Sequence, residues 1–282
     1  MKRRYIFTVV AGRSGQAYLT DVFRRHAKNC YPAFEEPQVT PVLEGFLGNY
    51  ERRFRRKFIE TNELLGRGKV LTAYEANNNS YIEKIAAKRI KTINSIMDNT
   101  RSTLYVDLSK YFARGLHLGF LGILPELSLI RLLRDPVTNM RSFLNRNKNF
   151  FLDNNRPESR TNLLRLESTD MNKGELYLWI WCELYLRFNQ MVACDKVVKH
   201  IEIRTERLDD TAYLENAFDK LEVEHNTIEK REHANTNASK GYGETKVTEK
   251  DIETFNRFMN RVPQSIRSQL TYFNDYEPNQ LL

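Results

Sequence analysis

The sequence predicts an α/β fold, in which a central, mainly parallel β-sheet is flanked by helices on both faces. Short apolar runs rich in β-branched and aromatic residues alternate along the chain with longer segments whose apolar residues recur at helical spacing. Such alternation is typical of parallel sheets covered by helices. The 282 residues contain 41% hydrophobic residues and no internal repeat, so we expect a single domain over residues 1–282.

The first predicted strand covers residues 5–10, and a turn at 12–15 joins it to a helix over 16–27. Pro136 begins another helix, because its fixed φ and missing N–H suit a first helical turn. The polar stretch 225–246 has no apolar period and is expected to form a long loop. The remaining predicted helices cover 52–65, 81–97, 175–192 and 248–259, and the remaining strands cover 103–106, 128–133 and 197–203.

The composition points to an anionic ligand and against a metal site. The chain carries 44 Lys and Arg against 36 Asp and Glu, a net charge of +8 that suits a nucleotide, a sulfated glycan, a nucleic acid or a membrane surface. Its three cysteines have no metal-ligand spacing. No apolar run is long enough to span a membrane. Residues 1–11 resemble a secretory signal, but 12–15 lack a cleavage pattern, so we expect a buried first strand and a cytoplasmic location.

The turn after the first strand predicts a phosphate-binding loop. In a strand-turn-helix unit the turn amides and the helix N-terminus favour an anion. Gly12 and Gly15 allow close approach of a ligand, Arg13 adds positive charge, and Ser14 adds a hydroxyl. The Gly-Lys-Ser/Thr of a Walker loop is absent, and Gln16 excludes a G-x-S-x-G nucleophile elbow. A tight turn with an incidental arginine is the alternative.

A second candidate anion site ends the strand at 128–133. There Arg134 precedes Asp135 and Pro136, and Ser142 follows eight residues after the arginine. Arginine offers a planar fork of donors to a phosphate, and serine adds a hydroxyl. The alternative is an Arg134–Asp135 pair that closes the strand, with Ser142 merely on a helix face.

Four segments resemble the sulfotransferases that use 3′-phosphoadenosine 5′-phosphosulfate (PAPS). The opening VVAGRSGQAYL is similar to the family's loop for the 5′-phosphosulfate, and LIRLLRDPVTNMRSFLNR is similar to its 3′-phosphate motif. NASKGYGETKVTEKDIETFNRFMNRVP resembles the C-terminal nucleotide loop of the carbohydrate sulfotransferases, and TLYVDLSKYFARG resembles the family's acceptor-side strand and loop. These segments span most of the chain in the family's order and imply a P-loop-like sulfotransferase fold.

The resemblance implies a site for PAPS and a hydroxyl acceptor. One or two Thr or Ser of the family pattern are replaced here by Gln16 and Ala17, which leaves a homologue that binds PAPS or its product PAP without turnover as an alternative. By position, Arg13, Ser14, Gly15, Gln16 and Ala17 would bind the 5′-phosphosulfate, Arg134 and Ser142 the 3′-phosphate, and Lys240, Gly241 and Tyr242 would cover the nucleotide.

The resemblance also implies a carboxylate as catalytic base. The histidine that small-molecule sulfotransferases use would fall near Ser109, where there is none, and His117 is expected to be structural or on the surface. Carbohydrate-type enzymes use a glutamate after the first helix, a position that Glu36 fits best, with Glu35 in reserve. Asp107 is a further carboxylate near the acceptor side. The acceptor is therefore expected to be a carbohydrate or another large hydroxyl compound.

Two other functions remain as alternatives. A nucleotide kinase would need the absent Gly-Lys-Ser/Thr turn. A nucleic-acid-binding module would need aromatic and basic residues interleaved on paired strands, which are not found, so no nucleic-acid partner is expected. Trp179, Trp181, Tyr177 and Tyr185 share one predicted helix and are expected in the core rather than in a glycan platform. The basic run 52–57 suits an anionic acceptor or a solvated helix face equally well.

Overall fold

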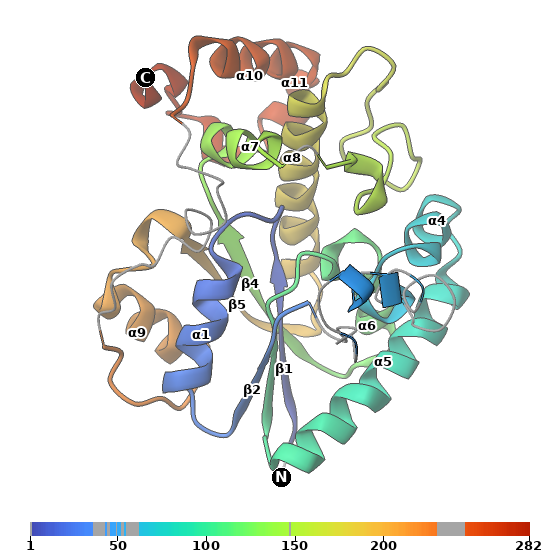
Figure 1. The fold of residues 1–282 in the computed structure, drawn as a ribbon, viewed down its shortest axis with the longest axis vertical. Coiled ribbons are helices and arrows are strands. Elements are labelled where there is room, and N and C mark those ends of the chain that lie inside the picture. The colour runs from blue at the N-terminus through green and yellow to red at the C-terminus, as the bar shows by residue number, and fades with distance from the viewer. Residues whose placement is uncertain are drawn as a thin grey trace.

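The structure is a computed structural model that describes residues 2–35, 43, 46–48, 50–51, 54, 62–146, 148–229 and 246–282. Its strands form one five-stranded parallel sheet in the order β2-β3-β1-β4-β5 (Figure 1). The predicted α/β fold with a parallel central sheet is confirmed. The strands are β1 (Arg4–Val9), β2 (Cys30–Ala33), β3 (Leu104–Asp107), β4 (Leu127–Leu133) and β5 (Val197–Arg204).

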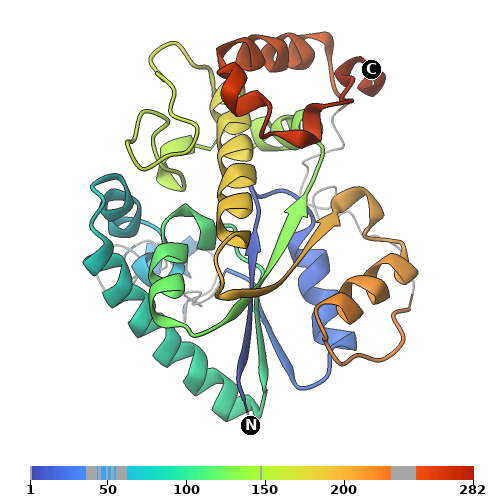
Figure 2. The ribbon, with the colours of Figure 1, turned by 180° about the vertical axis from the view of Figure 1, so that it is seen from behind.

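Both faces of the sheet are buried, which explains why its strands read as apolar runs. In β1 the side chain of Phe7 belongs to one core cluster, and that of Ile6 belongs to the other. Helices α1 (Gln16–His26) and α9 (Thr211–Lys220) cover the Ile6 face. The Phe7 face is covered by α5 (Asn79–Thr100), α6 (Leu116–Ile123) and α8 (Lys173–Val192) (Figures 1 and 2).

The remaining helices are short or lie at the carboxyl end of the sheet. Figure 2 shows α10 and the C-terminal turns beside the same end of α8 as α7. The sequence does not predict β2, α4, α6 or α9, and the predicted helix 52–65 is seen over its last turn. The elements are α3 (Asn62–Leu65), α4 (Lys69–Glu75), α7 (Pro136–Leu144), α10 (Glu249–Arg261) and α11 (Gln264–Arg267).

The helix boundaries follow from local chemistry. Helix α7 begins at Pro136 as predicted, and the Asp135 carboxylate accepts the Thr138 N–H at 2.8 Å as its N-cap. A capping box between Asn172 and Glu175 begins α8. The aromatic residues of α8 are buried, with Trp179 at 0% exposure, so their assignment to the core is confirmed. They are therefore not a surface platform for sugars.

The strand order has its topological switch point between β1 and β4. The chain leaves β1 toward β2 on one side of the sheet, and it leaves neighbouring β4 toward β5 on the other side. Where connections from adjacent parallel strands diverge in this way, the space beyond their carboxyl ends is the usual ligand site. Both predicted anion-binding segments begin there, at residues 10–15 and at Arg134.

Two kinds of feature are absent from the described residues. In the part of the chain that the structure describes, no helix combines the length and apolar character needed to cross a membrane. The same residues contain no group of three or more His, Cys, Asp or Glu side chains that could hold a metal ion.

Candidate functional site

The loop after β1 adopts a backbone conformation that few sequences permit. Gly12 has φ 102° and Gly15 has φ 78°, both in the left-handed region that suits glycine. Arg13 between them also has a positive φ of 59°, which is uncommon for a residue with a Cβ. The chain therefore turns sharply over residues 12–15 before α1 begins.

Four consecutive carbonyl groups of this loop are held by side chains from other elements. Because a trans peptide places its N–H opposite its C=O, each N–H of residues 12–15 points away from the side chain that holds the preceding carbonyl. The contacts are Ala11 O with Arg114 Nη2 at 2.8 Å, Gly12 O with Tyr177 Oη at 2.7 Å, Arg13 O with Arg134 Nη1 at 3.0 Å, and Ser14 O with Thr205 Oγ1 at 3.0 Å.

Asn139 reinforces this arrangement from α7. Its Nδ2 donates to Gly12 O at 3.0 Å and to Arg13 O at 3.1 Å, and its Oδ1 accepts from the Tyr177 hydroxyl at 2.8 Å. Asn139 is fully buried. The orientation of the loop amides is thus set by α7 and α8 as well as by the loop's own glycines.

The N-terminus of α1 extends the same donor surface. Its N-cap, Gly15, has no side chain to satisfy the first amides, and no acidic residue occurs in the first turn. Within the described residues, no hydrogen bond is found from the backbone N–H groups of residues 14–17. Turn amides and a helix N-terminus that converge in this way favour an anion such as a phosphate.

The second predicted anion residue lies against the first loop. Arg134 reaches it through the hydrogen bond to the Arg13 carbonyl, although 121 positions separate the two residues. Trp181 fixes the backbone at Arg134 by donating to its carbonyl at 3.0 Å. Burial raises the pKa of Tyr177, while Arg114, Arg13 and Arg134 act to lower it, so three guanidinium groups lie near one hydroxyl. Arg13 and Arg134 therefore both lie close enough to Tyr177 for their charges to lower its pKa.

Other predicted site residues are placed differently or lie outside the described residues. The Ser14 hydroxyl donates to Gly12 O at 3.1 Å, and the Gln16 amide donates to Leu108 O at 3.4 Å, so both are directed at the protein's own backbone. Ser142 lies half-buried on α7, with no hydrogen bond to Arg134 among the described residues. Glu36, Lys240, Gly241 and Tyr242 fall outside the described residues.

Glu35 lies near the loop, on the acceptor side predicted for a base. It follows β2 at the carboxyl edge of the sheet, with a positive φ of 52°. Its charge acts to raise the pKa values of Lys110, Tyr111 and Arg114. Lys110 in turn lies across Gly12, since a Cβ on that glycine would sit 3.2 Å from the lysine Cδ. Glu35 thus acts on the lysine that also lies against the β1–α1 loop.

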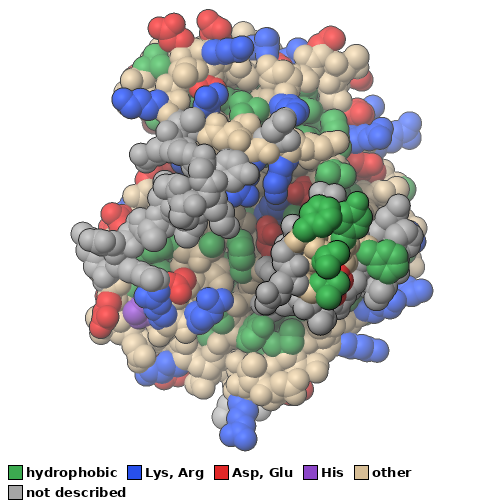
Figure 3. Space-filling view, viewed as in Figure 1, with side chains coloured by type: hydrophobic (Ala, Val, Ile, Leu, Met, Phe, Trp, Pro, Cys, Tyr) green, Lys and Arg blue, Asp and Glu red, His purple; other side chains and the backbone are tan. Residues whose placement is uncertain are grey.

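Lys110 and its neighbours form a charged cluster that the sequence predicts only in part. Lys110 Nζ lies 2.9 Å from Asp153 Oδ2, and Arg67 Nη2 lies 2.6 Å from Oδ1 of the same aspartate. The guanidinium of Arg114 is within 5.6 Å of the Tyr111 ring centre. Lys110 and Arg114 belong to the segment expected on the acceptor side. Figure 3 shows Lys, Arg, Asp and Glu side chains in a hollow on the face toward the viewer.

Two further sequence candidates have structural roles. Asp107 forms an ion pair with Arg89 at 2.6 Å, with both side chains 2% exposed, and it accepts the Ser109 N–H at 2.9 Å. It is therefore not placed to orient an acceptor. His117 is buried near the rings of Tyr74 and Phe112, and burial, with the charge of Arg187, lowers its pKa to about 3. That histidine stays neutral and structural.

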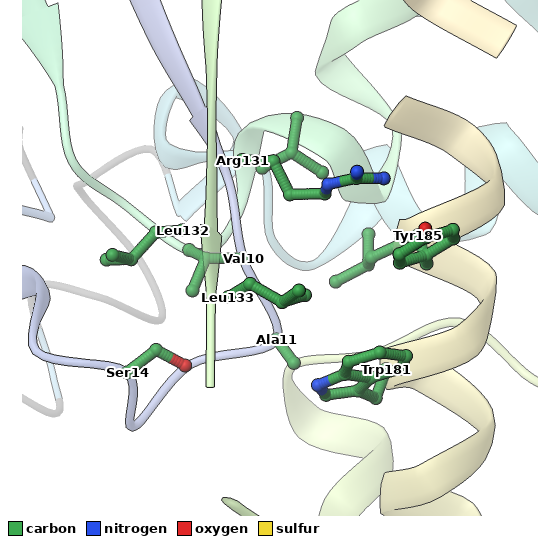
Figure 4. A pocket seen from close by; sticks show the side chains of 10 residues that line it. Val10, Ala11, Ser14, Arg131, Leu132, Leu133, Trp181 and Tyr185 are labelled. Carbon is green, nitrogen blue, oxygen red and sulfur yellow. The ribbon is translucent and has the colours of Figure 1, made fainter. Parts of the chain in front are cut away.

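A small pocket lies behind the loop, between the ends of β1 and β4 and the face of α8. Figure 4 shows Arg131 beside Tyr185, and Trp181 near Ala11. The Arg131 guanidinium stacks 4.1 Å from the Tyr185 ring centre and pairs with Glu202 at 2.7 Å. Its charge is thus neutralised within the protein, and the rest of the lining is mainly apolar. The side chains that line this pocket lie behind the loop, and the pocket does not suit a phosphate.

Solved structures that are similar to this chain include two sulfotransferase domains. No family model and no curated protein matches the sequence. The sulfotransferase domain from the curacin biosynthetic pathway is similar, with 15% identity and a TM-score of 0.49 over 96% of this chain and 98% of that one. The sulfotransferase domain from the Synechococcus PCC 7002 olefin synthase has 14% identity and the same TM-score over 93% and 98%. Similarity at these identities and TM-scores carries no conclusion about the chemistry of this chain.

Proposed function

We propose that the protein is a sulfotransferase that moves a sulfuryl group from PAPS to a hydroxyl acceptor. The observation that carries the proposal is the hydrogen bond from Arg134 to the carbonyl of Arg13. It joins two anion-binding segments at the carboxyl ends of adjacent strands. A ligand with phosphate-type groups on both the 3′ and the 5′ position of one ribose matches such a pair of adjacent sites, whereas a single anion would need only one.

The residues present suit the two ends of that nucleotide. The amides of residues 14–17 and the N-terminus of α1 would hold the 5′-phosphosulfate, with Arg13 supplying positive charge. Arg134 would hold the 3′-phosphate through its planar fork of donors. PAPS would supply the sulfuryl group together with a phosphate leaving group. Negative charge on the leaving side is stabilised by donors that are already oriented, because their carbonyls are fixed by other elements.

Of the two candidate bases, Glu35 is the one that lies within the described residues. Its negative charge acts on Lys110, which lies across Gly12, so the carboxylate is on the side of the loop where an acceptor would approach. A base has to come within hydrogen-bond reach of the acceptor hydroxyl and take its proton during transfer. Glu36 remains the second candidate for this role.

The acceptor class follows from the resemblance and from the surface near the hollow. We propose a carbohydrate or another large hydroxyl compound. Figure 3 shows an exposed hydrophobic patch beside the hollow, where an acceptor with an apolar or ring face could lie. Between residues 43 and 54, the large apolar side chains at least half exposed are Leu43, Phe46, Leu47, Tyr50 and Phe54.

A second candidate is a protein that binds the nucleotide without transferring its sulfuryl group. The orientation of Gln16 favours it, because the side-chain amide that could replace the family's hydroxyl donates to Leu108 O. Labelled sulfate from PAPS distinguishes the two candidates. Transfer to any member of a hydroxyl acceptor panel supports the enzyme. Tight binding of PAP with no transfer supports the binding protein.

Thermal unfolding with different nucleotides tests the nucleotide class. A ligand that binds only the folded state stabilises it by about 2.7 kcal/mol at a hundred times its Kd. We expect PAP to raise the Tm and ATP with Mg²⁺ to leave it nearly unchanged. Stabilisation by ATP and Mg²⁺ but not by PAP would contradict the proposal and would favour a kinase.

A further inference from the structure

Asp153 is the carboxylate around which the cations of the site are arranged. It follows the short 3-10 turn Phe150–Leu152, and its side chain is 15% exposed. One carboxylate oxygen lies 2.9 Å from Lys110 Nζ, and the other lies 2.6 Å from Arg67 Nη2. Its backbone carbonyl accepts Arg114 Nη1 at 2.9 Å. One residue thus contacts three cations, two from the segment after β3 and one, Arg67, from the segment before α4.

These contacts connect Asp153 to the anion-binding loop by two routes. Arg114 bonds the Asp153 carbonyl through Nη1 and the Ala11 carbonyl through Nη2. The stem of Lys110 lies across Gly12 while its ammonium is held at Asp153. A change at Asp153 should therefore reach the loop, although no hydrogen bond joins Asp153 to a described loop residue directly.

The charge balance shows what would happen without this carboxylate. Lys110, Arg67 and Arg114 would then face one another in a largely buried place, with Glu35 as the remaining nearby acid. Buried like charges repel strongly and either move apart or lose protons. Burial already lowers the pKa of Lys110, Arg114 lowers it further, and Asp153 opposes both effects.

We propose that Asp153 is a positioning residue that anchors the Lys110 ammonium, keeps it protonated and so holds the lysine stem across the β1–α1 loop. Its predicted effect on turnover rests on the proposed function. Its effect on Lys110 does not, and is measured separately. Lys110 is the group through which Asp153 acts, because its stem lies across Gly12 while its ammonium contacts the Asp153 carboxylate.

The first test measures the protonation of Lys110 directly. Competitive acetylation across pH, read for each lysine by peptide mass spectrometry, gives a titration midpoint for Lys110. The charged and titratable groups facing this lysine are Asp153, Glu35, Arg114, Arg67 and Tyr111. In Asp153→Asn the midpoint of Lys110 should shift to lower pH. The control Asp98→Asn breaks the exposed ion pair with Arg3 and should leave it unchanged. An unchanged Lys110 midpoint in Asp153→Asn would overturn the proposal.

The second test measures turnover. In Asp153→Asn we expect kcat to fall about a hundredfold, since small misplacements in an active site can have effects of this size. The KM for the acceptor should stay within about twofold, because Asp153 acts through Lys110 and Arg114 on the β1–α1 loop and is not itself proposed to contact the acceptor. Asp153→Glu keeps the charge, so it should restore the Lys110 midpoint and recover part of kcat. A wild-type kcat in Asp153→Asn would contradict the proposal.

The two tests separate this inference from the function it builds on. If the wild-type protein neither binds PAP nor transfers sulfate, the proposed function fails, and the acetylation midpoint still decides the role of Asp153. If Asp153→Asn does not fold, Asp153→Glu decides alone. In folded Asp153→Glu, a Lys110 midpoint near the wild-type value with a reduced kcat supports positioning, and a Lys110 midpoint shifted to lower pH rejects it.

Discussion

Asn139→Ala should loosen the anion-binding loop while leaving the fold intact. The substitution removes the hydrogen bonds from Nδ2 to Gly12 O and Arg13 O, and it removes the Oδ1 acceptor of the Tyr177 hydroxyl. Gly12 O keeps Tyr177, and Arg13 O keeps Arg134, so neither carbonyl is left without a partner. The Tyr177 hydroxyl keeps Gly12 O as an acceptor for its one proton, so the net loss is the two bonds from Nδ2. At about 1 kcal/mol for each of these two, the free energy of unfolding should fall by about 2 kcal/mol.

The effect on nucleotide binding is the informative part. With its carbonyls held less firmly, the loop should present its amides to a phosphate less often, and PAP affinity should fall about tenfold, or 1.4 kcal/mol. Urea unfolding and calorimetric titration with PAP measure the two quantities. Asn94→Ala is the matched control, because Asn94 also accepts a tyrosine hydroxyl, that of Tyr5 at 2.8 Å, but lies away from the loop. Reduced stability in Asn139→Ala with wild-type PAP affinity would refute this reasoning.

Three further predictions concern charge. Arg134→Ala should weaken PAP far more than adenosine 5′-phosphosulfate, which lacks the 3′-phosphate, and equal losses in titration would refute its assignment. Glu35→Gln should retain PAP binding and lose about a hundredfold or more in sulfate transfer; normal transfer would move the base role to Glu36. Burial opposes ionisation of Asp153, but Lys110 and Arg67 outweigh it and lower the pKa to about 2. The resulting stability, on the order of 2 kcal/mol, is present above about pH 4 and lost as the pH falls through about 2, so acid titration of unfolding should be shallower in Asp153→Asn.

The parallel sheet could be predicted because its central strands are buried on both faces and therefore read as apolar runs. Helix α7 was predictable from Pro136, whose chemistry marks a first turn. Strand β2 carries no comparable signal, because it has four residues, one of them a proline, at the edge of the sheet. Helix α9 follows a common rule, with Asp210 as its N-cap, but it begins directly after polar residues that resemble a loop.

Candidate site residues that lie in a local sequence motif could be predicted. Residues that hold such a motif in place from distant parts of the chain could not. Arg13 lies in the glycine-containing turn 12–15, and Arg134 lies in the Arg-Asp-Pro motif, so both are recognisable from sequence. Asn139 and Tyr177 orient the loop across 127 and 165 positions of sequence, and nothing local marks them. Asp153 lies in an irregular segment, so its contacts with Lys110 and Arg67 exist only in the folded chain.

A crystal structure of the protein with PAP tests the account most directly. We predict the 5′-phosphate within hydrogen-bond distance of the backbone N–H groups of residues 14–17, and the 3′-phosphate in contact with the Arg134 guanidinium. A nucleotide bound elsewhere, or bound at the loop with its 3′-phosphate turned away from Arg134, would contradict the claim that both strand ends form one site.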